Sequence, residues 1–149
     1  MKQIIYTMQF KGQAVPAGKS AGVLKAKTSA QSCIIATIVA GDGVSGATQH
    51  ATGDSANFES EVTMTGETSF QESGVITFGK KGHRLRFSTV GQGCIGPSSD
   101  PKLKQGAVIW RVEGGEGQFA GASGLITSNF LVSDTGEVTD NQFGVIFVK

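Results

Sequence analysis

The residue with the clearest chemical potential is Glu72, because the pattern around it places its carboxyl group on an apolar face. The segments Ser69–Phe78 and Arg84–Val90 alternate in polarity and are joined by Gly79–Gly82, which predicts a β-hairpin. Matching the apolar faces of the two strands puts Glu72 on the inner side. A carboxylate there must be paired, protonated or hydrogen-bonded, and it suits proton transfer, so Glu72 is the candidate catalytic residue. The alternative is a position at the rim of the strand, where the carboxylate reaches water.

No second residue completes a nucleophilic site. Ser123 lies in Gly-Ala-Ser-Gly-Leu, which lacks the Gly-x-Ser-x-Gly elbow, and a triad would need His50 or His83 near it. Cys94 lies in Gln92–Gln105, a long segment rich in turn-forming residues and interpreted as a loop. At Cys94 a small apolar contact is favoured over a reactive thiolate.

The chain has no recognisable metal or cofactor pattern. Its two histidines lie in different predicted loops, and no Cys-x-x-Cys or His-x-x-x-His spacing occurs. Gly-x-Gly sequences occur at Gly41–Gly43, Gly91–Gly93 and Gly115–Gly117, but none leads into a helix whose N-terminus would hold a phosphate. We therefore predict neither a metal nor a cofactor.

Composition and charge exclude several classes of protein. The net charge of +1 gives no electrostatic footprint for nucleic acid. No run of residues approaches the ~18 apolar residues of a membrane span, and Ile4–Gln9 is too short and too polar for a secretory signal core. Cys33 and Cys94 lie far apart, so free thiols are favoured over a disulfide. We expect a cytoplasmic protein without nucleic-acid or membrane partners.

The elements that must position Glu72 are strands, since no segment has a helical period. The 149 residues fit a single domain, 1–149. About eight to ten short strands at regular spacing indicate an antiparallel sandwich or barrel. Lys2–Phe10 and Phe143–Val148 are substantial strands at the two ends of the chain, and pairing them would remove two exposed edges. We therefore predict an all-β fold, a single antiparallel β-barrel of about eight strands.

The segment Cys33–Ala40 is apolar on both faces and rich in β-branched residues, which predicts a strand buried from both sides, with a short buried helix as the alternative. Gly41–Asn57 is interpreted as a long surface loop with a short strand through Ala47–Ala51. A barrel strand has one face outside, and the chain has no helix to cover it. A second subunit is the economical cover, so we expect a homo-oligomer.

Glycines dominate Gly114–Gly124, which lies between the predicted strands Ala107–Glu113 and Leu125–Val132. Such a density suits backbone at positive φ and sharp bends rather than helix. Phe119 is the one large apolar residue of the stretch. We expect it to plug one end of the barrel.

The pattern Gly115-x-Gly117-x-Phe119-Ala120-Gly121-Ala122-x-Gly124 resembles the motif of allene oxide cyclase-like and dirigent-like, calycin-type β-barrels, including bacterial members that are uncharacterised. The resemblance covers this motif and the strand rhythm after it. It implies an eight-stranded antiparallel barrel with a hydrophobic ligand inside, a dimer or trimer, and in some members isomerase or cyclase activity. The motif is structural in those barrels, so no catalytic residue is carried over from it.

The resulting hypothesis is a barrel that binds a hydrophobic small molecule in its interior, with an isomerase or cyclase as the enzymatic version. A filled barrel with a structural or assembly role and no ligand is the alternative. On sequence alone, it stays open which face of Val108–Glu113 points inward. The candidate ligand-binding residues are Phe70, Phe87, Trp110, Asn129 and Phe147.

Overall fold

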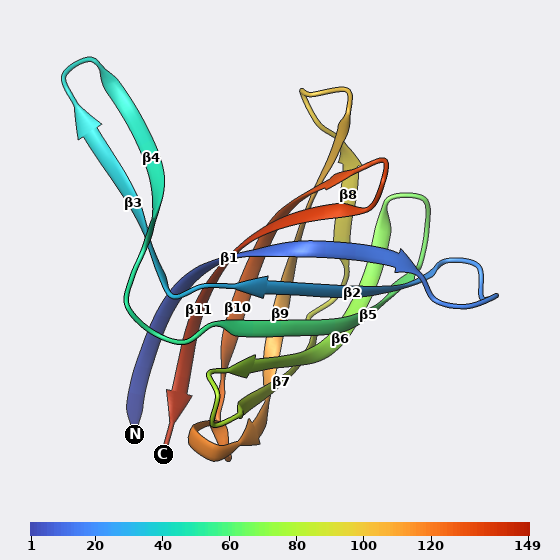
Figure 1. Ribbon diagram of the computed structural model, residues 1–149. Coiled ribbons are helices and arrows are strands. Elements are labelled where there is room, and N and C mark those ends of the chain that lie inside the picture. The colour runs from blue at the N-terminus through green and yellow to red at the C-terminus, as the bar shows by residue number, and fades with distance from the viewer.

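The chain folds into a closed antiparallel barrel of 8 strands, and strands account for 72% of its residues. The computed structural model describes all of residues 1–149. Around the barrel the order is β1, β2, β5, β6, β7, β9, β10, β11 and back to β1 (Figure 1). The barrel strands are β1 (Lys2–Pro16), β2 (Val23–Ala30), β5 (Ala56–Met64), β6 (Ser69–Phe78), β7 (His83–Thr89), β9 (Leu103–Glu116), β10 (Ser123–Ser133) and β11 (Glu137–Val148). This confirms the predicted fold class.

The first and last strands close the barrel, as predicted. β1 pairs with β11 over a register that runs from Lys2↔Val148 to Gln13↔Glu137. Both strands are longer than the sequence pattern indicated, because β1 continues to Pro16 and β11 begins at Glu137. Many of the added residues are polar. Those on the outer face, such as Lys11, Glu137 and Asn141, do not interrupt pairing, whereas Asp140 and Gln142 point inward.

One position in the barrel wall is shared by two short strands. β9 is 14 residues long, whereas β7 has only 7. β8 (Gly93–Pro97) pairs with β9 beyond the end of β7, and it also meets β6 at Ser69↔Cys94. The segment Gln92–Gln105, predicted as a loop, therefore contains a strand that completes the wall.

The glycine-rich turn plugs one end of the barrel, as expected. A short 3-10 helix, η1 (Gly117–Phe119), carries Phe119 inward, where its side chain is only 4% exposed. Gly117 and Gly121 have φ values of 63° and 69°, which favour glycine on both sides of it. The ring of Phe119 packs on Phe78 with a centroid distance of 5.2 Å. In Figure 1 this turn lies at the same end of the barrel as both termini.

The strand predicted over Cys33–Ala40 is confirmed, but its predicted burial from both sides is wrong. This segment forms β3, which pairs with β4 (Gly43–His50) in a separate two-stranded sheet that projects from the barrel (Figure 1). β2 pairs directly with β5, so the hairpin is an insertion between neighbouring barrel strands and its apolar residues gain no core. Ile38 is 57% exposed, and Val39 and Val44 are more exposed still. β4 also replaces about half of the loop predicted over Gly41–Asn57, and it includes most of the short strand predicted there through Ala47–Ala51.

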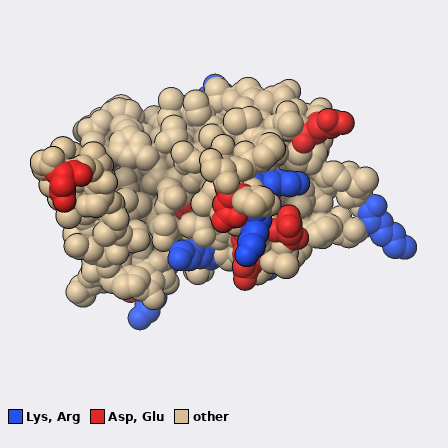
Figure 2. Space-filling view, turned by 90° about the horizontal axis from the view of Figure 1, so that it is seen from above, with Lys and Arg blue, Asp and Glu red and all other residues tan.

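The face of the molecule seen from above carries charges of both signs (Figure 2). In the view from above, basic and acidic side chains gather together on one side of the molecule (Figure 2). Lys27 and Glu59 form an exposed ion pair, with 3.8 Å between Nζ and Oε1. Both cysteines are free thiols. The structure contains no helix with the length and apolar character that a membrane crossing requires.

Candidate functional site

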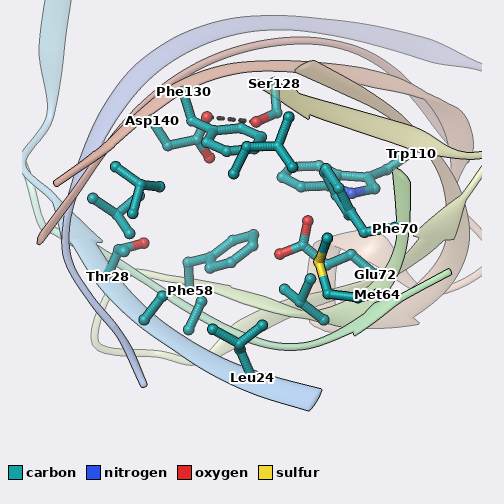
Figure 3. A pocket seen from close by; sticks show the side chains of 16 residues that line it. Leu24, Thr28, Phe58, Met64, Phe70, Glu72, Trp110, Ser128, Phe130 and Asp140 are labelled. Carbon is teal, nitrogen blue, oxygen red and sulfur yellow. Dashed lines mark hydrogen bonds between the residues drawn. The ribbon is translucent and has the colours of Figure 1, made fainter. Parts of the chain in front are cut away.

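The half of the barrel away from the plug contains a partly open pocket of about 120 Å³. The pocket and the plug lie at opposite ends of β1 and its partner β11. Ala14, near the end of β1, lines the pocket, whereas Lys149, which follows β11, lies beside Gly121 of the plug turn. Of the 16 lining residues, 12 are hydrophobic. They are contributed by every barrel strand except β7, and by β8, and they surround the space seen in Figure 3. The lining residues are Ala14, Leu24, Ala26, Thr28, Phe58, Val62, Met64, Phe70, Glu72, Ile95, Trp110, Ser128, Phe130, Val132, Val138 and Asp140.

An aromatic layer forms the floor of the pocket. The ring of Phe87 lies 5.2 Å from that of Phe58 and 4.5 Å from that of Trp110, measured between centroids. Phe10 also packs on Phe58, with 6.0 Å between the ring centroids. Trp110 is buried, and so are Val108 and Val112, which settles which face of β9 points inward. The layer separates the pocket from the tightly filled half of the barrel at the plug.

Glu72 projects from β6 into the pocket, with its oxygens toward the open middle (Figure 3). Its side chain is 8% exposed, so the interior position is correct and the rim position is not. The hydroxyl of Ser60 donates a hydrogen bond to Oε1 at 2.5 Å. Burial raises the pKa of Glu72 to about 7; the Ser60 hydrogen bond opposes this rise, and the nearby charge of Asp140 adds to it.

Asp140, on β11, is a second buried carboxyl group in the same pocket, and it is 5% exposed. Ser128 donates a hydrogen bond to Oδ1 at 2.6 Å, and the amide of Gln142 donates one to Oδ2 at 2.8 Å. The Tyr6 hydroxyl donates to Oε1 of Gln142 at 3.0 Å, which turns the Gln142 amide nitrogen toward Asp140. Burial raises the pKa of Asp140 to about 6 against these hydrogen bonds. Burial, and secondarily the charge of Asp140, raises the pKa of the Tyr6 phenol.

Two further polar atoms of the lining have no hydrogen-bond partner. They are the hydroxyl of Thr28 and the indole Nε1 of Trp110, both buried. The indole makes no hydrogen bond of standard geometry, yet it lies close enough to Glu72 to favour the ionised carboxylate. Buried polar groups in folded proteins are nearly always satisfied. The Thr28 hydroxyl is therefore available to a ligand in the pocket, whereas the indole N–H already interacts with Glu72.

The structure brings together some of the predicted site residues and not others. Phe70, Glu72 and Trp110 line the pocket, and Phe87 lies in the floor beneath it. Asn129 and Phe147, expected in the interior, point outward instead. Ser128 and Phe130 take the inner positions of β10, so Asn129 between them is exposed. Ile146 and Val148 do the same on β11 and leave Phe147 37% exposed.

Asp140 and Thr28 were missed by sequence reasoning. The signal for Asp140 was present, because it alternates with Gln142, Gly144 and Ile146, all on the inner face of β11. It was missed because the last strand was predicted to begin at Phe143. Thr28 lies between Ala26 and Ala30 on the inner face of β2. Small residues on both sides gave no signal that its hydroxyl would line a pocket.

The structure brings no group of three or more His, Cys, Asp or Glu side chains together. No family model, curated protein or solved structure matches this chain. The residues of the pocket are therefore the basis for any functional proposal.

Proposed function

We propose that this barrel binds a hydrophobic small molecule in the pocket above the aromatic floor. The observation that carries the proposal is an apolar void of about 120 Å³ with a few polar groups converging on it. Ligand sites have this composition, whereas protein interiors otherwise pack with few voids larger than a water molecule. An apolar cavity of roughly 150 Å³ holds a benzene molecule, so the pocket suits a ligand of that scale.

The alternative, a filled barrel with a structural role, fits only one half of the molecule. Near the plug the interior is solid, with Ile76, Leu85, Ile126 and Ile146 fully buried. The pocket half contains the buried carboxyl groups and the unpaired hydroxyl of Thr28. Polar groups of this kind lower stability unless something compensates them, and a purely structural barrel has no use for them.

Catalysis is a second proposal, supported by Glu72. A carboxyl group with a pKa of about 7 is suited to both accepting and donating a proton near neutral pH. An isomerase or cyclase of the kind implied by the resemblance to allene oxide cyclase-like and dirigent-like barrels would use such a group. For such an enzyme, Glu72→Gln would abolish turnover and spare the binding of a neutral substrate.

Methionine methyl groups provide a direct test of the binding proposal. Met64 lines the pocket, and Met1 is 96% exposed. In protein labelled with ¹³C at the methionine methyls, we expect toluene to shift the Met64 resonance in a saturable manner and to leave Met1 unchanged. Ala14→Phe, which fills the pocket lining, should abolish the shift. Val15→Phe, on the outer face of the same strand, should not. A Met64 resonance indifferent to toluene in the wild-type protein would refute the proposal.

We also propose that copies of the chain associate through the β3–β4 hairpin. An isolated two-stranded hairpin is marginally stable in water, and this one exposes Ile34, Ile38, Val39 and Val44. It contains a single acidic residue, Asp42, and no lysine or arginine, so it lacks the charges that guard exposed strands. Ile34 and Ile38 lie on one face of the hairpin, and the same face of a second hairpin fits as its cover.

Sedimentation velocity at micromolar concentration tests the association. The wild-type protein should sediment as an oligomer, and Ile38→Glu should sediment as a monomer because it places a charge in the apolar contact. Ile5→Glu is the matched control, since Ile5 is 61% exposed on the barrel wall rather than on the hairpin. A monomeric wild-type protein would rule the association out.

A further inference from the structure

The charge balance of the pocket is incomplete. Glu72 and Asp140 contribute two carboxyl groups, and none of the lining residues is Lys, Arg or His. Buried carboxylates without a cation are costly, and proteins compensate them with a partner of opposite charge or by protonation. The lining residues from β1, β2, β5, β8, β9 and β10 include no ionisable side chain, so the two carboxyl groups are compensated either by protonation or by a positive charge from outside the chain.

The hydrogen bonds around the two carboxyl groups favour their ionised forms. Asp140 accepts one bond at each oxygen, from Ser128 and from Gln142, and the Tyr6 hydroxyl holds Gln142 in the donating orientation. Glu72 accepts a bond at Oε1 from Ser60, while no side chain donates to Oε2. Donors of this kind stabilise a carboxylate rather than a carboxylic acid. The Trp110 indole also favours the ionised form of Glu72, and Oε2 retains capacity to accept a hydrogen bond from a ligand.

The rest of the lining suits an organic cation. The rings of Phe58, Phe70, Trp110 and Phe130 surround the space, and aromatic faces attract cations, most strongly when water is excluded. A metal ion fits poorly, because hard cations take six or more oxygen ligands and this lining is three-quarters apolar. The hydroxyl of Thr28, on the far side of the pocket from Trp110 in Figure 3, can also accept a bond from an N–H group.

We infer that the ligand of this pocket is a small apolar amine, whose ammonium group lies between the carboxylates of Glu72 and Asp140 and whose hydrocarbon part rests on the aromatic floor. This inference rests on the proposed function and adds the chemical class of the ligand. Binding the ammonium group stabilises both carboxylates, so the protonated forms present in the free protein release protons to solvent when the amine binds.

The release makes binding depend on pH. Burial raises the pKa of Glu72 to about 7 and that of Asp140 to about 6, so both are largely protonated at pH 5. The titratable groups that face them are each other and Tyr6, whose phenol stays neutral because its pKa is also raised. For each proton released, raising the pH by one unit lowers the dissociation constant by about tenfold, as long as the pH stays below the pKa of that carboxyl group. Affinity for an amine should therefore rise between pH 5 and pH 8 and then level off.

Calorimetric titration with benzylamine and benzyl alcohol, which share shape and size, tests the inference. At pH 8 we expect the wild-type protein to bind benzylamine at least about tenfold more tightly than benzyl alcohol, with the preference lost at pH 5. The double variant Glu72→Gln, Asp140→Asn should bind the two equally at both pH values. Glu137→Gln, an exposed carboxylate on the same strand as Asp140, should keep the preference. The wild-type pH profile stands as evidence even where the double variant does not fold.

The outcomes separate the two proposals. Benzyl alcohol binding as tightly as benzylamine at pH 8 would overturn the amine and leave the hydrophobic pocket intact. An affinity for benzylamine that does not change between pH 5 and pH 8 would likewise overturn it. Failure of both compounds and of toluene to bind would overturn the proposed function together with the inference.

Discussion

Phe119→Ala is expected to lower the free energy of unfolding by about 3–5 kcal/mol, the usual loss for a buried phenylalanine. The side chain closes one end of the barrel and packs on Phe78. Its neighbours Gly117 and Gly121 have no side chains that could move into the space, so the cavity left by the truncation would persist. Urea unfolding measures the change.

Gln118→Ala is the control for this prediction. Gln118 lies in the same turn but is exposed, so its truncation should change the free energy of unfolding by less than about 0.5 kcal/mol. A loss under about 1 kcal/mol for Phe119→Ala would mean that the aromatic ring does not close the barrel.

Glu72→Gln is expected to stabilise the ligand-free protein at pH 8 by up to about 3 kcal/mol and to have little effect at pH 4.5 or below. The folded pKa of Glu72, about 7, lies above the ordinary value of 4.5 for a glutamate side chain. A group with a raised folded pKa contributes stability that is complete below the unfolded pKa and is lost as pH rises through the folded value. The wild-type protein thus loses stability between pH 4.5 and pH 8, and the neutral amide of glutamine removes that loss.

Asp140 should behave in the same way over a lower range of pH. Its pKa rises from 3.8 to about 6, so Asp140→Asn should remove the part of the loss that occurs between pH 4 and pH 7. The two effects will not add, because each carboxylate contributes to the environment of the other. Thermal unfolding from pH 4 to pH 8 measures both, with Glu137→Gln as a control that leaves the profile unchanged. A wild-type profile parallel to those of Glu72→Gln and Asp140→Asn would show that neither carboxyl group is buried in a dry site.

The alternation of apolar and polar residues could predict only those site residues that lie on strands where every second residue is apolar. Between Ser69 and Phe78, apolar residues at every second position made the inward direction of Glu72 readable, and Phe70 followed from it. Strand length was harder to predict, because polar residues on the outer face of β11 resemble a turn. Because the last strand was predicted to begin at Phe143 rather than Glu137, Asp140 was not recognised as an interior residue. The second carboxyl group of the pocket was therefore not predicted.

The hairpin β3–β4 shows a different limit. An apolar run such as Cys33–Ala40 reports only that its side chains favour an apolar surrounding, and a core or another subunit can provide it. Nothing in the run itself shows that β2 would pair directly with β5 and leave the hairpin outside the barrel. The predicted inward orientation of Asn129 and Phe147 was wrong for a related reason. A shift of one residue along a strand moves a side chain from the inner to the outer face.

A crystal structure of the protein soaked in bromobenzene tests the central claim most directly, because the anomalous signal of bromine locates the ligand. We expect one strong peak inside the barrel, between the floor formed by Phe58 and Trp110 and the mouth near Met64, with the ring clear of the plug at Phe119. A pocket occupied only by protein side chains, with bromine peaks confined to the outer surface, would contradict the claim that this barrel binds small hydrophobic molecules.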